Sequence, residues 1–243
     1  MIYLPFEEEL EEIPDVPNLE KLAERVRRHC GQDRRRRLDL APVCSVFGAI
    51  VRVAELGGRE GGQEAVLVPL DEGRFGVVVD PTPRGGWDRI PPGVRLNLRR
   101  HRLRFRVGHE LAHTFFYSRR SAGPPRRQLF DSDEQEDFCD RFSRTILVPR
   151  REIACMEPTA EGLVKLQRAC DVSLEVAARA VAAARSDLNV SIWFEDRDRM
   201  LRRQWGGRAR RVPDRFAADE LAERVPGAVP LHDRRQWVAV SQS

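Results

Sequence analysis

The spacing of apolar residues along the chain predicts helices in some stretches and strands in others. Helical spacing of three to four residues marks the ranges 18–30, 99–118, 133–148, 159–185 and 215–224. Short β-rich runs mark the ranges 46–53, 65–70, 75–79, 189–194 and 237–240. This order predicts an α+β fold, in which a small mixed or antiparallel sheet packs on a helical core. A helical hairpin and a short C-terminal α/β extension would follow.

The breaks between these stretches divide the chain into four predicted regions. Residues 1–17 hold three prolines and an acidic run, which predict an irregular lead-in. Residues 18–158 would form the core domain, and 159–186 a helical hairpin packed on that core. Residues 187–243 would form an extension of unknown role.

The helical pair at 159–185 has two interpretations. Ser173 is a good N-cap for the second helix, and the link Cys170–Val172 between the helices is short. This spacing resembles a helix-turn-helix, but two helices that only pack on the core give the same pattern. We favour packing, and direct nucleic-acid binding stays open.

The composition is that of a globular protein with a mildly basic charge. Of the 243 residues, 33% are charged and 41% hydrophobic, and the net charge is +4. The basic residues are almost all arginine, with lysine at Lys21 and Lys165, which is typical of codon bias rather than of a nucleic-acid surface. We therefore interpret the run Arg34–Arg37 as a solvated turn in preference to a phosphate-binding patch.

Targeting features and cysteine usage predict a cytoplasmic protein with no membrane partner. No stretch of the sequence approaches 18 consecutive apolar residues, and the acidic N-terminus does not resemble a secretory signal. The five cysteines are odd in number and include no CxxC pair, so they are expected to be reduced and mostly buried.

The sequence His109-Glu110-Leu-Ala-His113 is an HExxH motif within a predicted helix. Two histidines four residues apart lie about 40° apart around a helix, so both imidazoles can reach one metal ion. Glu110 can then lie beside a metal-bound water and act as the general base. The motif predicts a zinc hydrolase and, as the first hypothesis, a metallopeptidase.

The alternative is that the motif arose by chance, as two surface histidines on an ordinary helix. Three observations weigh against that alternative. The motif lies in the apolar segment Phe105–Phe116, and the chain has only five histidines. A charged Glu110 in a buried helix also needs a partner or a role. We therefore interpret the motif as a metal site.

A catalytic zinc site normally has three protein ligands and an open position, so a third ligand is needed. The run Asp131–Asp140, which includes Glu136, offers many carboxylates at the start of the next predicted helix. Several of them are explained by the preference for acidic residues at a helix N-terminus, namely Asp131, Asp133, Glu134 and Asp137. His101 and His232 are weaker rivals as ligands.

Two blocks of the sequence resemble the ImmA/IrrE family of metallopeptidases. Arg104–His113 is similar to the family's RF-x-x-AHE-x-GH helix, and Glu136–Pro149 is similar to its E-x-x-AN-x-FA-x-x-LLMP helix. The resemblance covers about residues 20–185, is strongest over 104–149, and implies that residues 18–158 form a zincin-like metallopeptidase domain.

Matched residue by residue, the resemblance implies that His109, His113 and Glu136 are the metal ligands and that Glu110 is the catalytic base. Asp140 stands where the family usually has Asn, and can still orient a ligand histidine through its ring N–H. The sequence departs from the family pattern at Gly108, Ala112 and Cys139, where the family usually has Ala, Gly and Ala.

The resemblance implies metal-assisted hydrolysis of a peptide bond, with Glu110 passing the proton of the attacking water to the leaving amine. Zinc (Zn2+) is the default for two histidines and one glutamate, and these ligand types also admit manganese (Mn2+). Tyr117 or an arginine from 99–106 can stabilise the oxyanion, although Tyr117 is equally typical of a packing residue.

Members of that family typically cleave a helix-turn-helix transcriptional repressor. The resemblance therefore implies a zinc-dependent endopeptidase with such a repressor as its separate protein substrate, in stress response or in mobile elements. The alternative is a DNA-binding or sensory transcriptional regulator with a non-catalytic zincin-like metal site, which would use the helical pair and the arginine runs at 34–37 and 202–211. Glu110 favours the enzyme, because a structural site needs no general base.

Overall fold

The computed structural model describes residues 19–54, 56, 64–80, 92–117, 132–196, 199–206, 220–225, 227–231 and 236–242. The chain divides into two compact units, Met1–Leu147 and Val148–Ser243. This division differs from the predicted boundary between residues 158 and 159, and it groups the helical hairpin with the C-terminal strands. The predicted lead-in at 1–17 lies outside the described residues.

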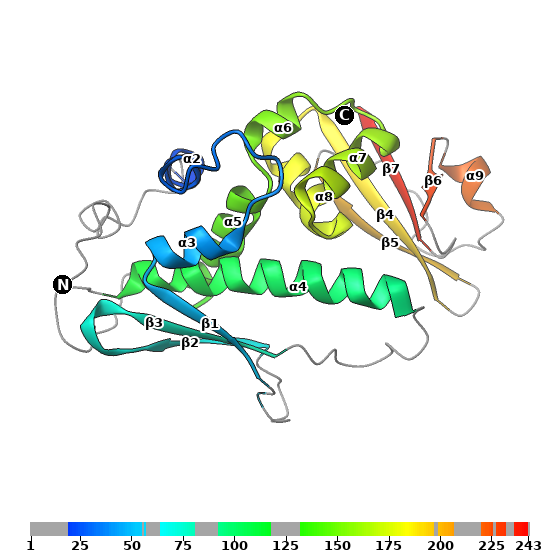
Figure 1. Ribbon diagram of the computed structural model, residues 1–243. Helices are drawn as coiled ribbons and strands as arrows, with labels where there is room; N and C mark the ends of the chain where they lie inside the picture. Colours follow the sequence, from blue (N-terminus) through cyan, green and yellow to red (C-terminus); the bar gives the residue numbers. More distant parts are fainter. Residues whose placement is uncertain are drawn as a thin grey trace. The chain divides into compact units, whose positions relative to one another are not determined.

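The first unit contains a three-stranded mixed sheet (Figure 1). Its strands are β1 (Ala49–Val53), β2 (Ala65–Pro69) and β3 (Phe75–Val79), in the order β1-β3-β2. β1 runs parallel to β3, and β2 pairs antiparallel with β3 as the predicted hairpin. The predicted small mixed sheet is therefore confirmed.

The first strand begins later than the predicted start at residue 46, because the residues before it form helix α3 (Leu40–Val46). The carboxylate of Asp39 caps this helix by accepting a hydrogen bond of 3.1 Å from the backbone N–H of Ala41. Only Val46 of the predicted strand lies in this helix, and no element was predicted for residues 40–45. There the cap and a proline in the first helical turn favour a helix.

Among its described residues, the first unit also contains three longer helices: α2 (Leu19–His29), α4 (Pro92–His113) and α5 (Ser132–Leu147). α4 contacts β2 and β3 of the sheet and also packs against α5. It begins earlier than predicted, and the last turn of the predicted helix is a separate 3-10 helix at Thr114–Phe116. This long helix therefore joins the sheet to the helical layer (Figure 1).

Aromatic rings fix the end of α4 against α5. The ring of Phe115, just beyond the HExxH motif, lies 5.6 Å from that of Phe47, 5.8 Å from that of Phe138 and 5.3 Å from that of Phe142, all edge to face. All four side chains are buried. Such contacts add to the free energy of apolar burial and hold the two helices that carry the predicted ligands.

The run Arg34–Arg37 lies in an exposed turn, as expected. The side chain of Arg27, which is 2% exposed, holds the backbone of this run by donating hydrogen bonds to the carbonyls of Arg35 and Arg36. Arg27 also donates to the carbonyl of Ile146 at 2.7 Å, at the C-terminal end of α5. A cation in that position is favoured by the helix dipole.

The second unit contains a four-stranded antiparallel sheet and short helices. The strands are β4 (Leu188–Asp196), β5 (Arg199–Trp205), β6 (Val229–Pro230) and β7 (Gln236–Gln242), in the order β5-β4-β7-β6. The sequence did not predict β5. Four of its seven residues are arginine or glutamine, and these polar residues do not alternate with the apolar ones. Of the helix predicted at 215–224, the described part is α9 (Leu221–Arg224).

The predicted helical pair is present as α7 (Ala160–Cys170) and α8 (Leu174–Ala184), preceded by the short helix α6 (Arg150–Ala154). Ser173 caps α8 as expected, and its hydroxyl accepts a hydrogen bond from the backbone N–H of Val176 at 3.2 Å. α8 packs on β4 and β5, and α7 packs on β7. The pair thus packs on the C-terminal sheet, whereas we had expected it on the core at 18–158.

Both units combine helices with a small sheet, so the predicted α+β class is confirmed. None of the helices in the described part of the chain has the length and apolarity needed to cross a membrane.

Candidate metal centre

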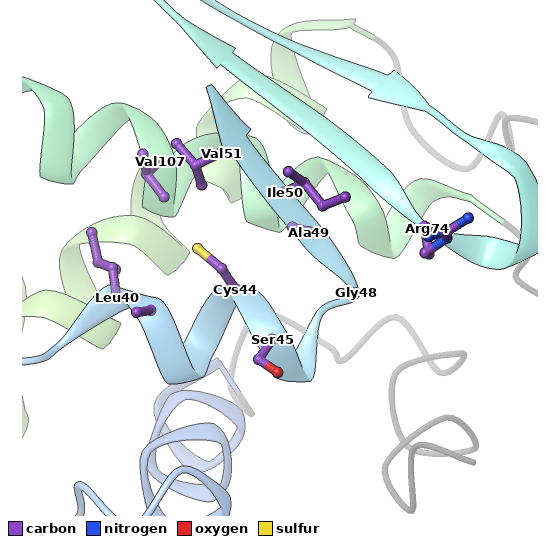
Figure 2. Close-up of a pocket in the computed structure, with 10 residues that line it drawn as sticks. Leu40, Cys44, Ser45, Gly48, Ala49, Ile50, Val51, Arg74 and Val107 are labelled. Carbon is purple, nitrogen blue, oxygen red and sulfur yellow. The ribbon is translucent and has the colours of Figure 1, made fainter. Parts of the chain in front are cut away.

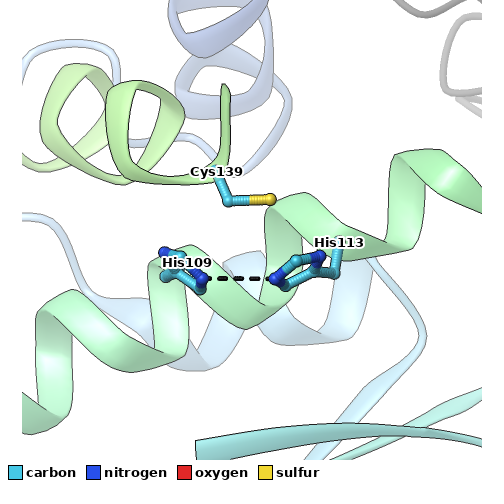
Figure 3. Close-up of side chains that lie close together, drawn as sticks. All are labelled: His109, His113 and Cys139. Carbon is cyan, nitrogen blue, oxygen red and sulfur yellow. Dashed lines mark hydrogen bonds between the residues drawn. The ribbon is translucent and has the colours of Figure 1, made fainter. Parts of the chain in front are cut away.

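The structure brings the two histidines of the HExxH motif together on one face of α4. The Nε2 atoms of His109 and His113 lie 3.2 Å apart, and their ring centroids are 4.9 Å apart (Figure 3). In a tetrahedral zinc site with Zn–N bonds of about 2.0–2.1 Å, two ligand nitrogens lie about 3.3 Å apart. The pair therefore has the separation that a shared metal ion requires.

Glu136 on α5 faces this pair. Its Oε2 lies 3.1 Å from the Nε2 of His109, and its Oε1 lies 3.3 Å from the Nε2 of His113. The side chain is 60% exposed, so the carboxylate approaches the histidines from the solvent side. The residue predicted as third ligand thus lies across both nitrogens, with an oxygen type that zinc accepts.

Asp140, one helical turn after Glu136, contacts the opposite nitrogen of His109. Its Oδ1 lies 2.9 Å from the Nδ1 of His109. Burial raises the pKa of Asp140, but the hydrogen bond with His109 and the charges of His109, Arg144 and Arg106 outweigh burial, and the pKa falls below its ordinary value. An ionised Asp140 accepts from Nδ1–H and leaves the Nε2 lone pair directed at the metal position.

Cys139 also lies beside the histidine pair, although the sequence did not predict it as a ligand. Its side chain is fully buried, and its Sγ and one ring nitrogen each of His109 and His113 all lie within 4.8 Å of one another (Figure 3). The signal was present in the sequence, because Glu136, Cys139 and Asp140 are spaced i, i+3 and i+4 and so share one helix face. The structure thus offers two donors beside the histidine pair, Glu136 and Cys139.

Glu110 occupies a different side of α4, towards the sheet. It is 7% exposed and forms a hydrogen bond with the backbone of Leu67 in β2. Burial raises the pKa of Glu110, and the positive charges of His109 and Arg106 and the hydrogen bond with Leu67 oppose that rise only in part. A carboxylate with a raised pKa is suited to accept a proton and then to donate it.

The two predicted oxyanion candidates differ in their surroundings. The ring of Tyr117 packs edge to face on that of Phe75, 5.6 Å between centroids, as expected for a packing residue. Among the arginines, Arg102 and Arg106 both donate through Nε to Glu64 at 2.9 Å. The positive charge of Arg106 also lowers the pKa of Glu110, which opposes the effect of burial.

The remaining ligand candidates do not join the cluster within the described residues. His101 is buried elsewhere on α4, while His232 and Asp131 lie outside the described residues. Asp133 and Glu134 are exposed in the first turn of α5, as the helix-dipole explanation predicts. Asp137 lies 3.7 Å from Arg141 in a surface ion pair.

A cavity of about 580 Å³ is lined by residues of α3, β1 and α4 (Figure 2). Its lining is mainly apolar, with Leu40, Cys44, Ile50 and Val107 on the walls and Arg74 at one end. The residues that line it include none of the HExxH side chains. The candidate metal ligands are thus not among the residues that line this cavity.

Comparison with known proteins leaves the family of this chain undetermined. No family model and no curated protein matches the sequence. Among solved structures, a chain described as a Mycobacterium tuberculosis transcriptional regulator is similar with a TM-score of 0.42 and 16% identity. The match covers 84% of this chain, which spans 58% of that one.

Proposed function

We propose that the chain is a zinc-dependent endopeptidase that hydrolyses a peptide bond in a protein substrate. The supporting observation is the convergence of three donors, the Nε2 atoms of His109 and His113 and the carboxylate of Glu136, at separations of 3.1–3.3 Å. Two imidazoles and one carboxylate are the ligand set of several zinc peptidases.

The residues around these donors have complementary roles in the proposed reaction. Zinc held there would polarise the scissile carbonyl and lower the pKa of a bound water towards about 7. Glu110, buried beside His109, would accept the proton of the attacking water and deliver it to the leaving amine. Asp140 would keep His109 in the tautomer that presents Nε2.

The position of β2 at the edge of its sheet favours the proposal that the substrate is a peptide. Among the described strands, β2 is an outer strand of its sheet, and the backbone of Leu67 within it forms a hydrogen bond with Glu110. Val68 and Leu70 nearby are 41% and 37% exposed. An extended peptide that pairs with such an edge gains backbone hydrogen bonds and would bring its carbonyl groups next to the proposed base.

The proposed substrate is a helix-turn-helix transcriptional repressor, as the resemblance to the ImmA/IrrE family implies. We place the reaction in the cytoplasm because the cysteine usage and the acidic N-terminus predict that location. Cleavage of such a protein at one or a few sites would relieve repression, which is regulatory proteolysis. The protein would then act on a separate chain.

The test compares the zinc-loaded wild type with Glu110→Gln on helix-turn-helix repressors encoded near its gene. We expect cleavage by the wild type and a loss of about 10²–10⁴-fold in rate with Glu110→Gln, because the general base is removed while the metal donors remain. Glu24→Gln, an exposed substitution of the same kind on α2, is the matched control and should cleave normally. Zinc content should equal one per chain in all three proteins.

A different outcome would favour the transcriptional regulator. If the zinc-loaded wild type cleaves none of these repressors, and salt-sensitive DNA binding survives Glu110→Gln, the metal site is not catalytic. The endopeptidase proposal would then be rejected.

A further inference from the structure

Helix α5 presents three donor side chains to the histidine pair, and the proposed function uses only two of them. Glu136 contacts the Nε2 atoms, and Asp140 contacts the Nδ1 of His109. Cys139 lies between these two residues on the same helix face, and Figure 3 shows its sulfur directed towards the gap between His109 and His113.

A buried cysteine is usually a small apolar residue of the core, so burial alone does not indicate a site. Here the sulfur forms a group with the ring nitrogens of His109 and His113, all within 4.8 Å of one another. A zinc–sulfur bond of about 2.3 Å is longer than a zinc–nitrogen bond, so a sulfur ligand lies somewhat farther from the nitrogens than they lie from each other. The grouping of one sulfur with two imidazole nitrogens matches the donor types of a mixed nitrogen and sulfur site.

We propose that the thiolate of Cys139 is a fourth protein ligand of the metal ion, bound through Sγ on the buried side of the site. The inference rests on the proposed metal site and defines its composition. When the sulfur–metal bond forms, the thiol releases its proton to solvent and no electrons are transferred.

Two consequences follow from a sulfur ligand. Thiolate is a soft ligand that selects zinc over manganese, so Cys139 would decide between the two metals that the histidines and Glu136 admit. Four protein donors also fill a tetrahedral site. Water would then replace the carboxylate of Glu136 on the metal, because Glu136 is exposed whereas Cys139 is buried in the core.

The test replaces zinc by cobalt(II) in the full-length protein and records the absorption spectrum at one equivalent. A thiolate ligand gives an intense sulfur-to-cobalt charge-transfer band in the near ultraviolet, which nitrogen and oxygen ligands do not give. We expect this band in the wild type and in Cys44→Ala, a control that removes another buried thiol of the same unit. We expect its loss in Cys139→Ala, with cobalt still bound and a tenfold or greater loss of zinc affinity.

The two proposals fail in different ways. If the wild type binds one cobalt ion without the charge-transfer band, the Cys139 inference is wrong, while the site of two histidines and one glutamate stands. If the wild type binds no cobalt or zinc, both proposals are wrong. Cys139→Ser, which nearly preserves the side-chain volume, gives the same comparison should Cys139→Ala not fold. Retention of the band in either variant would also overturn the inference.

Discussion

The contact between Asp140 and His109 determines which nitrogen of His109 is available to bind a metal ion. An imidazole can present either nitrogen to a metal, and a partner that accepts from one nitrogen selects the other. Asp140 is such a partner, at 2.9 Å from Nδ1. The family that the sequence resembles usually has Asn at this position, and an amide oxygen accepts the same hydrogen bond.

Replacement of Asp140 should therefore lower the zinc affinity by an amount that depends on the new side chain. Asp140→Ala should weaken zinc binding by about 10- to 100-fold, because His109 loses the group that orients it. Asp140→Asn should retain most of the affinity. The measurement is competition for zinc against a chelator, with Asp137→Ala, an exposed neighbour on α5, as the control. Equal affinities for the Ala variant and the wild type would contradict the orienting role.

A second residue-scale prediction concerns alkaline stability. Burial raises the pKa of the Cys44 thiol from 9.0 to about 11. Between pH 9 and pH 11 the folded protein keeps a thiol proton that the unfolded chain has lost, so the free energy of unfolding falls as pH rises through this window. A difference of two units between the pKa of Cys44 in the folded and unfolded states lowers the free energy of unfolding by at most about 2.7 kcal/mol.

Urea unfolding at pH 8 and at pH 10.5 checks this effect. The loss of stability between the two pH values should be smaller for Cys44→Ala than for the wild type, and Cys155→Ala should resemble the wild type because Cys155 is exposed. Burial also raises the pKa of Cys30 to about 11, so part of the decline should remain in Cys44→Ala. An identical decline in all three proteins would refute the assignment to Cys44.

At the scale of elements, the close approach of α4 and α5 positions the candidate site. A Cβ added at Gly108 would lie 2.7 Å from the Oγ of Ser143 and 3.4 Å from its Cβ. The Ser143 hydroxyl in turn donates a hydrogen bond of 2.7 Å to the carbonyl of Phe105 on α4. This approach explains why the chain has glycine immediately before the first histidine, where the ImmA/IrrE family usually has alanine.

Gly108→Ala should consequently destabilise the protein by about 1–3 kcal/mol, although alanine is the better helix former by about 1 kcal/mol. Ser143→Ala removes the clashing oxygen, so the double variant should be more stable than the sum of the single changes predicts. A double-mutant cycle from urea unfolding measures this coupling. A coupling energy of zero would show that the two side-chain positions do not meet.

At the scale of the whole molecule, the candidate ligands all belong to one of the two compact units. His109, His113, Glu136 and Cys139 lie in Met1–Leu147, and the antiparallel sheet of β4, β5, β6 and β7 lies in Val148–Ser243. A metal that binds only the folded state of the first unit stabilises that unit by mass action.

Hydrogen exchange with and without zinc tests this division. Zinc should slow amide exchange in α4 and α5, and it should leave β4 and β7 unchanged within error. Glu110→Gln should respond to zinc in the same way, because it keeps the donors, whereas His109→Ala should lose the response. Equal protection of both units would show that metal binding is coupled across the whole chain.

Much of the fold was predictable, because it depends on local patterns. The periodicity of α5 and the hairpin of β2 and β3 follow from side chains close together in sequence, and both are present. The strand β5 was not predicted, because its polar and apolar residues do not alternate clearly. Helix α3 was not predicted, because it is short and its start is set by the Asp39 cap rather than by a long apolar period. The sequence placed the two histidines, Glu136 and Asp140 in one predicted site, and the structure brings these side chains together. It did not predict that Cys139 lies beside them.

The sequence by itself determined the helical spacing that places His109 beside His113 and Glu136 beside Asp140, because each pair lies within one turn of one helix. Only the tertiary structure decided that these two helix faces meet, at Nε2–carboxylate distances of 3.1 and 3.3 Å. Only the tertiary structure shows that the sulfur of Cys139 lies beside His109 and His113, and that the helical hairpin packs on the C-terminal sheet. The physical reason is that packing between helices depends on the shapes of surfaces far apart in sequence, such as Gly108 against Ser143, which no local pattern specifies.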